Sequence, residues 1–228
     1  MIIQKILYTL GRHFTLAYAR LLIDYSIQWH APLPAGPKLI VANHPSFSDP
    51  FAFMMLSPRP ISILITATAF LVPLFGLYLR KTRHIPVDSN GRRALNAAIS
   101  RLKSGESVGL FIEGHSSPPE GGFHPPRTGA VRMALQTGVP IVPVGIHLAR
   151  ERLHVIHGKI KGKIYRQYWY LRGPLHITVG EPIRVQGQIE DRAHVRAETQ
   201  RVMQHIITLV EESRQRWLAK HTPHEKHQ

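Results

Sequence analysis

Short apolar runs alternate along this chain with segments of helical periodicity, and that alternation limits the possible folds more than any other feature. Strand-length runs occur at 38–42, 61–66, 107–112, 141–147 and 175–179. Helical patterns lie between or after them, at 89–104, 129–137 and 191–219. Strands that alternate with helices are typical of an α/β protein. We therefore expect one domain with a central mixed, mostly parallel sheet flanked by helices.

The N-terminal segment carries apolar residues at helical spacing from residue 2 to about 28, with basic residues among them. Such a helix suits a membrane interface or the protein's own core equally well. We expect residues 1–30 to form an amphipathic, membrane-associating helix. Prolines and a glycine at 32–37 break the pattern, so the main domain is expected at 31–219 and a loose polar tail at 220–228.

Residues 61–79 carry no charge and are long enough to be considered as a membrane span. The first part is β-branched, and Pro73 and Gly76 interrupt the rest. Basic residues flank the segment on both sides, so the charge distribution gives no orientation. We expect a strand followed by an apolar helix that dips into the membrane.

The charge balance is strongly basic, with 29 Lys and Arg against 14 Asp and Glu. Such a surface attracts a polyanionic partner: nucleic acid, anionic lipid or a phosphate-bearing compound. The basic and aromatic stretch at 150–173 fits lipid headgroups, coenzyme A phosphates or single-stranded nucleic acid. Because the chain has no cysteine, disulfides and a cysteine nucleophile are excluded. No His-Glu-x-x-His stretch occurs, and no metal is expected.

Two polar segments follow predicted strands. In the first, 43–49, His44 is suited to take a proton near neutral pH, and Asp49 would orient its ring if the loop folded back. On this local pattern alone, the simpler interpretation is that Asp49 caps a helix and His44 is a surface histidine. In the second, 111–117, small residues could present backbone N–H groups to an anion, and Glu113 could orient a substrate.

Four motifs in order resemble those of the PlsC-like glycerol-phosphate and lysophosphatidic acid acyltransferase family, from about Pro37 to Ile146. They are Asn43-His44-x₄-Asp49, the segment 69–76 leading to Ile85-Pro-Val-Asp88, Phe111-Ile-Glu113-Gly114, and Val139-Pro-Ile-Val-Pro143-Val-Gly145. Together they are far more specific than any one alone, and they favour a catalytic His44 over a surface histidine.

The resemblance implies that His44 is the general base on an acceptor hydroxyl and that Asp49 is its partner. It implies a substrate-binding set of Asn43, Glu113, Gly114, His115, Ser116, Arg92, Arg127 and Pro143. Acyl-CoA or acyl-carrier protein would be the co-substrate, with no bound cofactor. Membrane lipids would be the partners, at the cytoplasmic face of the cell membrane, and the protein would be monotopic or peripheral.

Two departures concern the acceptor. Ser89 and Ser116 stand where the family usually has the arginines that hold phosphate. Serine cannot copy the bidentate fork of arginine, so Arg92, Arg93 or Arg127 would have to substitute. Two alternatives stay open: an acyltransferase for a non-glycerophosphate lipid, or a basic membrane- or nucleic-acid-binding protein without activity. Nucleic acid ranks below lipid because of the four motifs.

Overall fold

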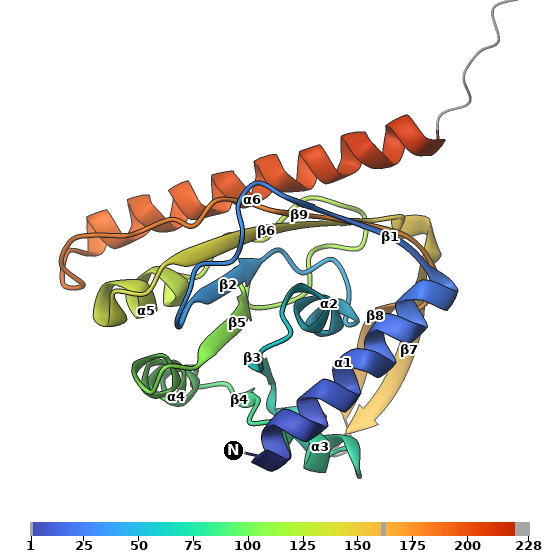
Figure 1. Ribbon diagram of the computed structural model, residues 1–228, viewed down its shortest axis with the longest axis horizontal. Coiled ribbons are helices and arrows are strands. Elements are labelled where there is room, and N and C mark those ends of the chain that lie inside the picture. The colour runs from blue at the N-terminus through green and yellow to red at the C-terminus, as the bar shows by residue number, and fades with distance from the viewer. Residues whose placement is uncertain (1, 161–162, 222–228) are drawn as a thin grey trace, which may run out of the picture.

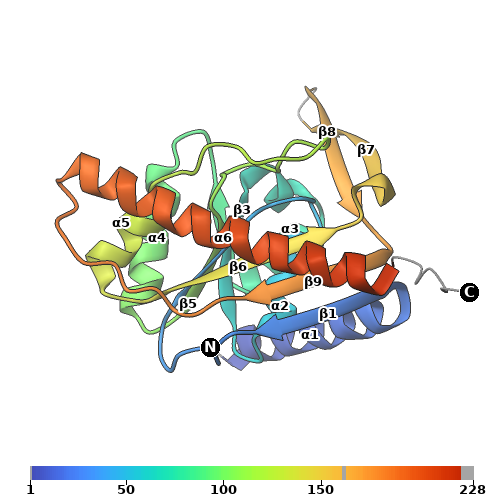
Figure 2. The same ribbon diagram turned by 90° about the horizontal axis from the view of Figure 1, so that it is seen from above.

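A seven-stranded sheet forms the centre of the molecule, in a computed structural model that describes residues 2–160 and 163–221 (Figures 1 and 2). Its strands are β1 (Ile23–Trp29), β2 (Leu39–Ala42), β3 (Ile61–Thr66), β4 (Ile85–Val87), β5 (Ser107–Phe111), β6 (Ile141–Leu148) and β9 (Gly173–Val179), in the order β1-β9-β6-β2-β5-β3-β4. Only the β6–β9 pairing is antiparallel among these neighbours. The predicted mixed, mostly parallel sheet is therefore confirmed.

Helices cover both faces of the sheet, as the alternation along β2 requires. Leu39 and Val41 point into one core, built with α4 (Arg92–Lys103), α5 (Gly129–Thr137) and α6 (Arg192–His221). Ile40 and Ala42 point into the other, which α2 (Asp49–Leu56) covers. The backbone of α6 passes so close to β6 that a Cβ on Gly145 would lie 2.3 Å from the α6 backbone.

The N-terminal helix α1 (Ile2–Leu22) is present but shorter than predicted. The expectation of helix to about residue 28 was wrong, because 23–29 form β1 and pair in parallel with β9. The residues of β1 alternate between apolar and polar, Ile-Asp-Tyr-Ser-Ile-Gln-Trp, which is strand periodicity.

Helix α1 packs on the protein with its less apolar side. The buried residues of the helix are Gln4, Tyr8, Thr15 and Ala19. Tyr8 is fully buried, and its hydroxyl donates to the backbone oxygen of Ser57. Five of the exposed large apolar side chains lie on a stripe nearly opposite: Ile3, Ile6, Leu10, Phe14 and Leu21. The helix therefore contacts the domain and still presents an apolar surface outward.

The uncharged segment 61–79 is divided among three elements. Strand β3 is followed by the 3₁₀ helix η1 (Ala67–Leu71) and the short helix α3 (Phe75–Lys81), beside the N-terminal half of α1 (Figure 1). The strand was predicted correctly. Among the described residues, every helix is too short or too polar to cross a bilayer. Exposed apolar side chains here are Leu71, Val72, Leu74 and Leu77.

The basic stretch at 150–173 forms a 3₁₀ turn, η2 (Arg150–Arg152), and a hairpin of β7 (Leu153–Ile160) and β8 (Lys163–Tyr170). The hairpin is a separate two-stranded sheet that projects from the body (Figure 2). Of the expected tail from residue 220, the first two residues continue α6, and 222–228 lie outside the described residues.

Candidate active site

The loop that joins β2 to α2 carries His44 at the carboxyl end of a parallel strand. Functional side chains gather at this edge in α/β folds, since several strands end there together. The partners of β2 are β5 and β6, both parallel to it, so the loops after all three strands meet at this edge. The segment 113–128 after β5 therefore lies beside His44.

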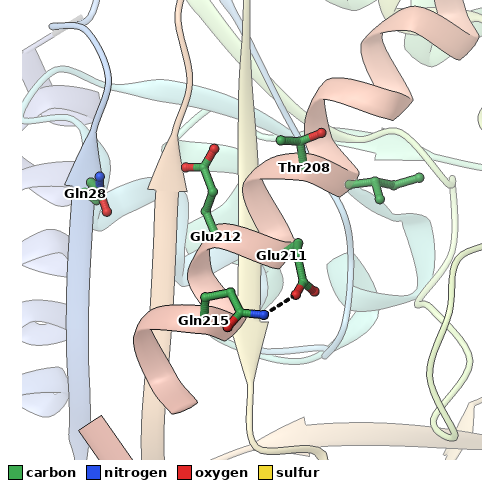
Figure 3. A pocket seen from close by; sticks show the side chains of 6 residues that line it. Gln28, Thr208, Glu211, Glu212 and Gln215 are labelled. Carbon is green, nitrogen blue, oxygen red and sulfur yellow. Dashed lines mark hydrogen bonds between the residues drawn. The ribbon is translucent and has the colours of Figure 1, made fainter. Parts of the chain in front are cut away.

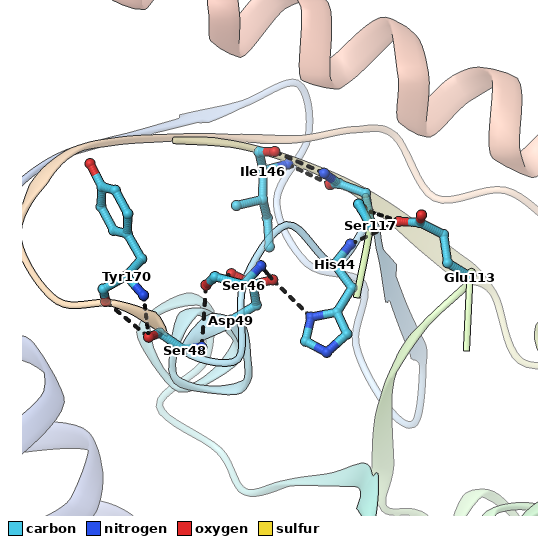
Figure 4. A network of polar contacts seen from close by, with 9 residues as sticks. His44, Ser46, Ser48, Asp49, Glu113, Ser117, Ile146 and Tyr170 are labelled. Carbon is cyan, nitrogen blue, oxygen red and sulfur yellow. Dashed lines mark hydrogen bonds and ion pairs between the residues drawn. The ribbon is translucent and has the colours of Figure 1, made fainter. Parts of the chain in front are cut away.

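His44 and Asp49 are in contact. Nδ1 of the imidazole lies 2.8 Å from Oδ2 of the carboxylate (Figure 4). An ionised carboxylate only accepts hydrogen bonds, so Nδ1 donates and the neutral ring keeps its free electron pair on Nε2. Within the described part of the chain, no group hydrogen-bonds to Nε2. The site thus holds an oriented imidazole whose basic nitrogen is open to a ligand.

Ser46 holds Asp49 in place, a role that the sequence analysis missed. The backbone N–H of Ser46 donates to Oδ2 of Asp49 at 2.7 Å, and its hydroxyl donates to Oδ1 at 2.6 Å. Asp49 was expected to be the N-cap of α2, but Ser48 occupies that position and Asp49 is the first helical residue. Its carboxylate turns back into the loop because Ser46 supplies two donors there. The sequence carries one signal of this role, which is the serine three residues before the aspartate.

The His44 ring also stacks on Phe111 at the end of β5, with ring centroids 3.9 Å apart and planes at 9°. The Phe111 ring stacks in turn on Phe53 of α2. Both phenylalanines belong to the apolar core beneath α2. The imidazole is therefore held flat against a packed aromatic surface and by the Asp49 contact, with 13% of its side chain exposed.

Glu113 is fully buried and organises the loops around His44. One carboxylate oxygen accepts from the backbone N–H of His44 at 3.1 Å and from the Ser117 hydroxyl at 2.6 Å. The other accepts from the backbone N–H of His124 at 2.8 Å. The backbone of Ser117 closes the network by donating to the His44 carbonyl oxygen at 2.7 Å. Glu113 thus shapes the site from behind, without an exposed surface for a substrate.

The next three predicted residues line the turn after Glu113. Gly114 has φ +77, and a Cβ there would lie 3.1 Å from the Arg127 side chain. His115 is exposed, and its ring meets the His124 ring edge-on at 5.0 Å. Partial burial, followed by the charges of His124 and Arg127, lowers the pKa of His115. The Ser116 hydroxyl is buried and has no hydrogen-bond partner among the residues described.

Two arginines lie close to this centre. Arg127 is exposed and its side chain packs beside Gly114. Arg150, which follows β6, donates from Nη1 to the Pro118 carbonyl oxygen at 2.5 Å. Burial lowers the pKa of Arg150, while Glu113 and Asp49 act in the opposite direction and so lie within its electrostatic reach. Arg92 begins α4 and is exposed, and no contact in the structure joins it to His44.

Two predicted site residues have other surroundings. Asn43 is buried and bridges two strands: its amide N–H donates to the Ile146 carbonyl, and its amide oxygen accepts from the Ile146 N–H. Pro143 lies on the sheet face that α6 covers, beside Gly180 and Leu209. That face is opposite the one on which His44 stacks, so Pro143 does not reach the imidazole.

A shallow hollow between α6 and β1 is separate from this site (Figure 3). Its lining residues are Gln28, Ile207, Thr208, Glu211, Glu212 and Gln215. The acidic groups there are already paired, since Glu211 bonds Arg214 and Gln215, and Glu212 bonds His30. The hollow therefore offers no oriented base, in contrast to the loop after β2 that carries His44 and Asp49.

An α/β sheet with a carboxylate-oriented histidine at the carboxyl edge of a parallel strand defines a class of proteins equipped to take a proton from a substrate hydroxyl or amine. The family is given by comparison with known proteins. The chain belongs to the acyltransferase family, whose model matches residues 26–147. The matched range contains every motif residue discussed above.

Individual relatives agree with the family. A 1-acyl-sn-glycerol-3-phosphate acyltransferase of Chlamydomonas reinhardtii is 32% identical over 119 residues, which are 50% of this chain and 35% of the relative. One of Escherichia coli K12 is 26% identical over 125 residues, 53% of this chain and 51% of the relative. The matched part thus spans between about a third and a half of the length of these relatives.

A solved structure shows the same fold. The crystal structure of the 1-acyl-sn-glycerophosphate (LPA) acyltransferase PlsC from Thermotoga maritima superposes with a TM-score of 0.69 at 22% identity. The superposition covers 92% of this chain and 80% of that one. The likeness therefore includes elements outside the region matched by the family model.

Proposed function

We propose that this protein transfers a fatty acyl group from an acyl thioester, acyl-CoA or acyl-carrier protein, to the free hydroxyl of a lysophosphatidic-acid-type acceptor. The observation that carries the proposal is the 2.8 Å contact between His44 and Asp49 in a member of the acyltransferase family. The names of the curated relatives support the acceptor class, since these are 1-acyl-sn-glycerol-3-phosphate acyltransferases.

In the proposed reaction, Nε2 of His44 takes the proton of the acceptor hydroxyl as its oxygen attacks the thioester carbonyl carbon. Asp49 stabilises the imidazolium that forms. The carbon–sulfur bond then breaks, and the proton passes from the imidazolium to the departing thiolate. Because a thiolate is a good leaving group, an activated alcohol suffices and no acyl-enzyme is needed. The absence of cysteine from the chain agrees with direct transfer.

The acceptor phosphate needs cations near His44, and the usual arginine positions hold Ser89 and Ser116. We assign the phosphate contact to Arg127, which packs beside Gly114, and Arg150, which bonds to Pro118 at the other end of the 113–118 segment. Arginine binds phosphate through paired N–H groups. The guanidinium of Arg150 has five N–H donors, and one of them bonds to the described part of the protein, so the others can reach a phosphate. Arg92 is not assigned to the phosphate, because it is exposed at the start of α4 and no contact in the structure joins it to His44.

A lipid acceptor requires access to a membrane, and we propose that α1 supplies it. Its apolar stripe faces away from the body, and the exposed apolar residues of η1 and α3 lie next to it. Lys5 and Arg20 are exposed on the same helix, and basic residues of this kind are typical of helices that lie in the interface of an anionic bilayer. We propose peripheral binding at the cytoplasmic membrane face.

The test is acyl transfer from a labelled thioester by purified wild type and by His44→Ala in mixed micelles. We expect His44→Ala to lower turnover by roughly 10²- to 10⁴-fold, the usual contribution of a general base. His205→Ala, an exposed histidine on α6, is the matched control. Equal activity in all three proteins would remove His44 from the mechanism.

The acceptor is tested with a panel that differs only in the phosphate, for example lysophosphatidic acid against monoacylglycerol. Preference for lysophosphatidic acid supports the assignment. Equal use of both would favour the alternative drawn from Ser89 and Ser116, an acyltransferase for a lipid without glycerol phosphate.

A further inference from the structure

The β7–β8 hairpin is the part of the molecule that the proposed reaction does not explain. It stands outside the central sheet as a two-stranded ribbon that extends away from the body (Figure 2). Two-stranded hairpins are at best marginally stable in water unless something packs on them. Its base is fixed, because Tyr170 and Leu153 pack with Ala19 of α1 and Met55 of α2. The exposed Val155, Ile156, Ile164 and Tyr165 belong to none of the apolar clusters that the described residues form.

The exposed side chains of the hairpin are apolar, aromatic and basic. Ile164 is 74% exposed, and Val155, Ile156 and Tyr165 are exposed as well. The guanidinium of Arg166 lies 5.3 Å above the Tyr168 ring. Glu151 is the single acidic residue between Arg150 and Gly173. Basic groups beside Tyr, Trp and aliphatic side chains match the headgroup layer of an anionic bilayer, where charge and apolar burial act together.

The hairpin is also bonded to the loop that carries the catalytic pair. The backbone N–H of Phe47 donates to the Tyr168 carbonyl at 2.8 Å. The Ser48 hydroxyl donates to the Tyr170 carbonyl at 2.9 Å, and the Tyr170 N–H lies 3.1 Å from the same hydroxyl oxygen. Phe47 lies between the two parts, with its ring centroid 6.1 Å from the Trp169 ring and 6.1 Å from the His44 ring.

From these contacts we infer that the β7–β8 hairpin is a second membrane-binding element, which docks on an anionic lipid surface and sets the His44 loop at that surface. Helix α1 and the hairpin then hold the protein at two places, which lie apart in the view of Figure 2. The inference takes from the proposed function only that the acceptor is a membrane lipid.

Direct contact can be measured without turnover, because a cysteine introduced into this cysteine-free chain is its only thiol. We would label Ile164→Cys with a polarity-sensitive fluorophore and add vesicles of phosphatidylcholine, with or without phosphatidylglycerol. Labels at Thr208→Cys on the exposed side of α6 and at Leu10→Cys on α1 are the negative and positive references. We expect a blue shift at 164 and 10 with the anionic vesicles, and none at 208.

Charge is tested in the same assay. Arg166→Gln should weaken vesicle binding by the hairpin about fivefold, the usual effect of one basic residue at an anionic surface. Arg196→Gln on α6 removes the same charge elsewhere and should change binding less than about twofold.

Two results would overturn the inference. In one, the emission of the label at 164 stays unchanged while that of the label at 10 shifts. Helix α1 would then contact the membrane, and the hairpin would not. In the other, the label at 164 responds to a single-stranded oligonucleotide and not to vesicles, which assigns the hairpin to nucleic acid. Neither result depends on whether His44 is the base. The proposal for the hairpin can therefore fail while the proposed reaction holds, and the reverse.

Discussion

At the scale of single residues, the site depends on side chains that fix other side chains. Ser46 turns Asp49 back toward the loop, Asp49 orients His44, and Glu113 holds the backbone of His44 from below. A buried carboxylate such as Glu113 is stable only when its oxygens are hydrogen-bonded, and three donors from separate parts of the loops meet that need. The imidazole is therefore positioned before a substrate arrives.

Replacing Asp49 with asparagine removes the charge beside His44 while keeping the shape of the side chain. The asparagine side chain would keep an oxygen for Ser46 but would no longer stabilise the imidazolium, so Asp49→Asn should lower kcat by roughly 10²- to 10⁴-fold. The melting temperature should change little. The measurement is steady-state kinetics together with thermal unfolding. A kcat near wild type would show that the contact is a structural one.

Arg150 is expected to act on acceptor binding rather than on the chemical step. Arg150→Gln removes a charge-assisted bond to phosphate, and we expect KM for lysophosphatidic acid to rise roughly 10- to 100-fold with kcat little changed. Arg150→Lys keeps the charge and should recover part of the loss. If KM for an acceptor without phosphate rises equally, Arg150 serves only to hold Pro118.

Part of the site was predictable from the sequence, and part of it was not. The pairing of His44 with Asp49 was expected from the family resemblance of four ordered motifs, whereas the local pattern alone favoured a capping Asp49 and a surface His44. The burial of Glu113 was not, because its donors come from positions 44, 117 and 124 and meet only in the folded chain. Pro143 was misplaced for a related reason: the sequence does not tell which face of a buried strand a residue occupies.

At the scale of elements, the clearest local signals gave the most accurate bounds. Helix α5 was predicted at 129–137 and occupies Gly129–Thr137. Strand β1 was hidden because Tyr25 also continues the helical spacing of the residues before it. The hairpin was left unassigned, since its basic and aromatic residues show no buried face. Strand β1 forms because it pairs with β9, and the hairpin is held by its contacts with the loop after β2. Both sets of contacts join residues far apart in the sequence, so a local pattern cannot show them.

His84 should make stability depend on pH at the end of helix α3. Its ring is buried, Nδ1 accepts from the Ile63 N–H at 3.1 Å, and burial lowers its pKa to about 4. The unfolded chain has the higher pKa, about 6.5, so it binds the proton first as pH falls. The contribution of His84 is complete above pH 6.5 and is lost between there and about pH 4, by up to about 3 kcal/mol.

The variant His84→Asn separates this effect from others, because its amide oxygen can accept from Ile63 without titrating. We expect urea unfolding of His84→Asn to depend less on pH between 6.5 and 4 than that of the wild type. His147, whose pKa burial also lowers to about 4, contributes in the same direction and stays in both proteins. Parallel pH profiles for the two proteins would contradict the assignment to His84.

At the scale of the whole molecule, polar and apolar surfaces are distributed unusually on α1. The helix directs polar and small residues toward the domain and an apolar stripe outward, the reverse of a helix on a soluble protein. The two sequence interpretations of this helix, core packing and membrane contact, are therefore compatible, because one side packs on the domain and the apolar stripe is left exposed.

Removing the stripe should release the protein from membranes without unfolding it. We expect the triple variant Ile6→Ser, Leu10→Ser, Phe14→Ser to partition less onto vesicles by on the order of tenfold for each side chain. Its melting temperature should stay near wild type, since Tyr8 and its contact to Ser57 remain. Trp29→Ser on β1 is an exposed apolar control. Unchanged partitioning of the triple variant would leave membrane contact to other surfaces.

The parallel pairing of β1 with β9 joins residues as much as 150 positions apart, as Ser26 and His176 show. During synthesis, α1 and β1 leave the ribosome well before β9, the strand that pairs with β1, has been synthesised. A ribosome adds about 5–20 residues each second, so the wait lasts on the order of ten seconds. Throughout that interval the residues of the α1 stripe are already synthesised, so a bilayer nearby can bind them before β1 has its partner strand.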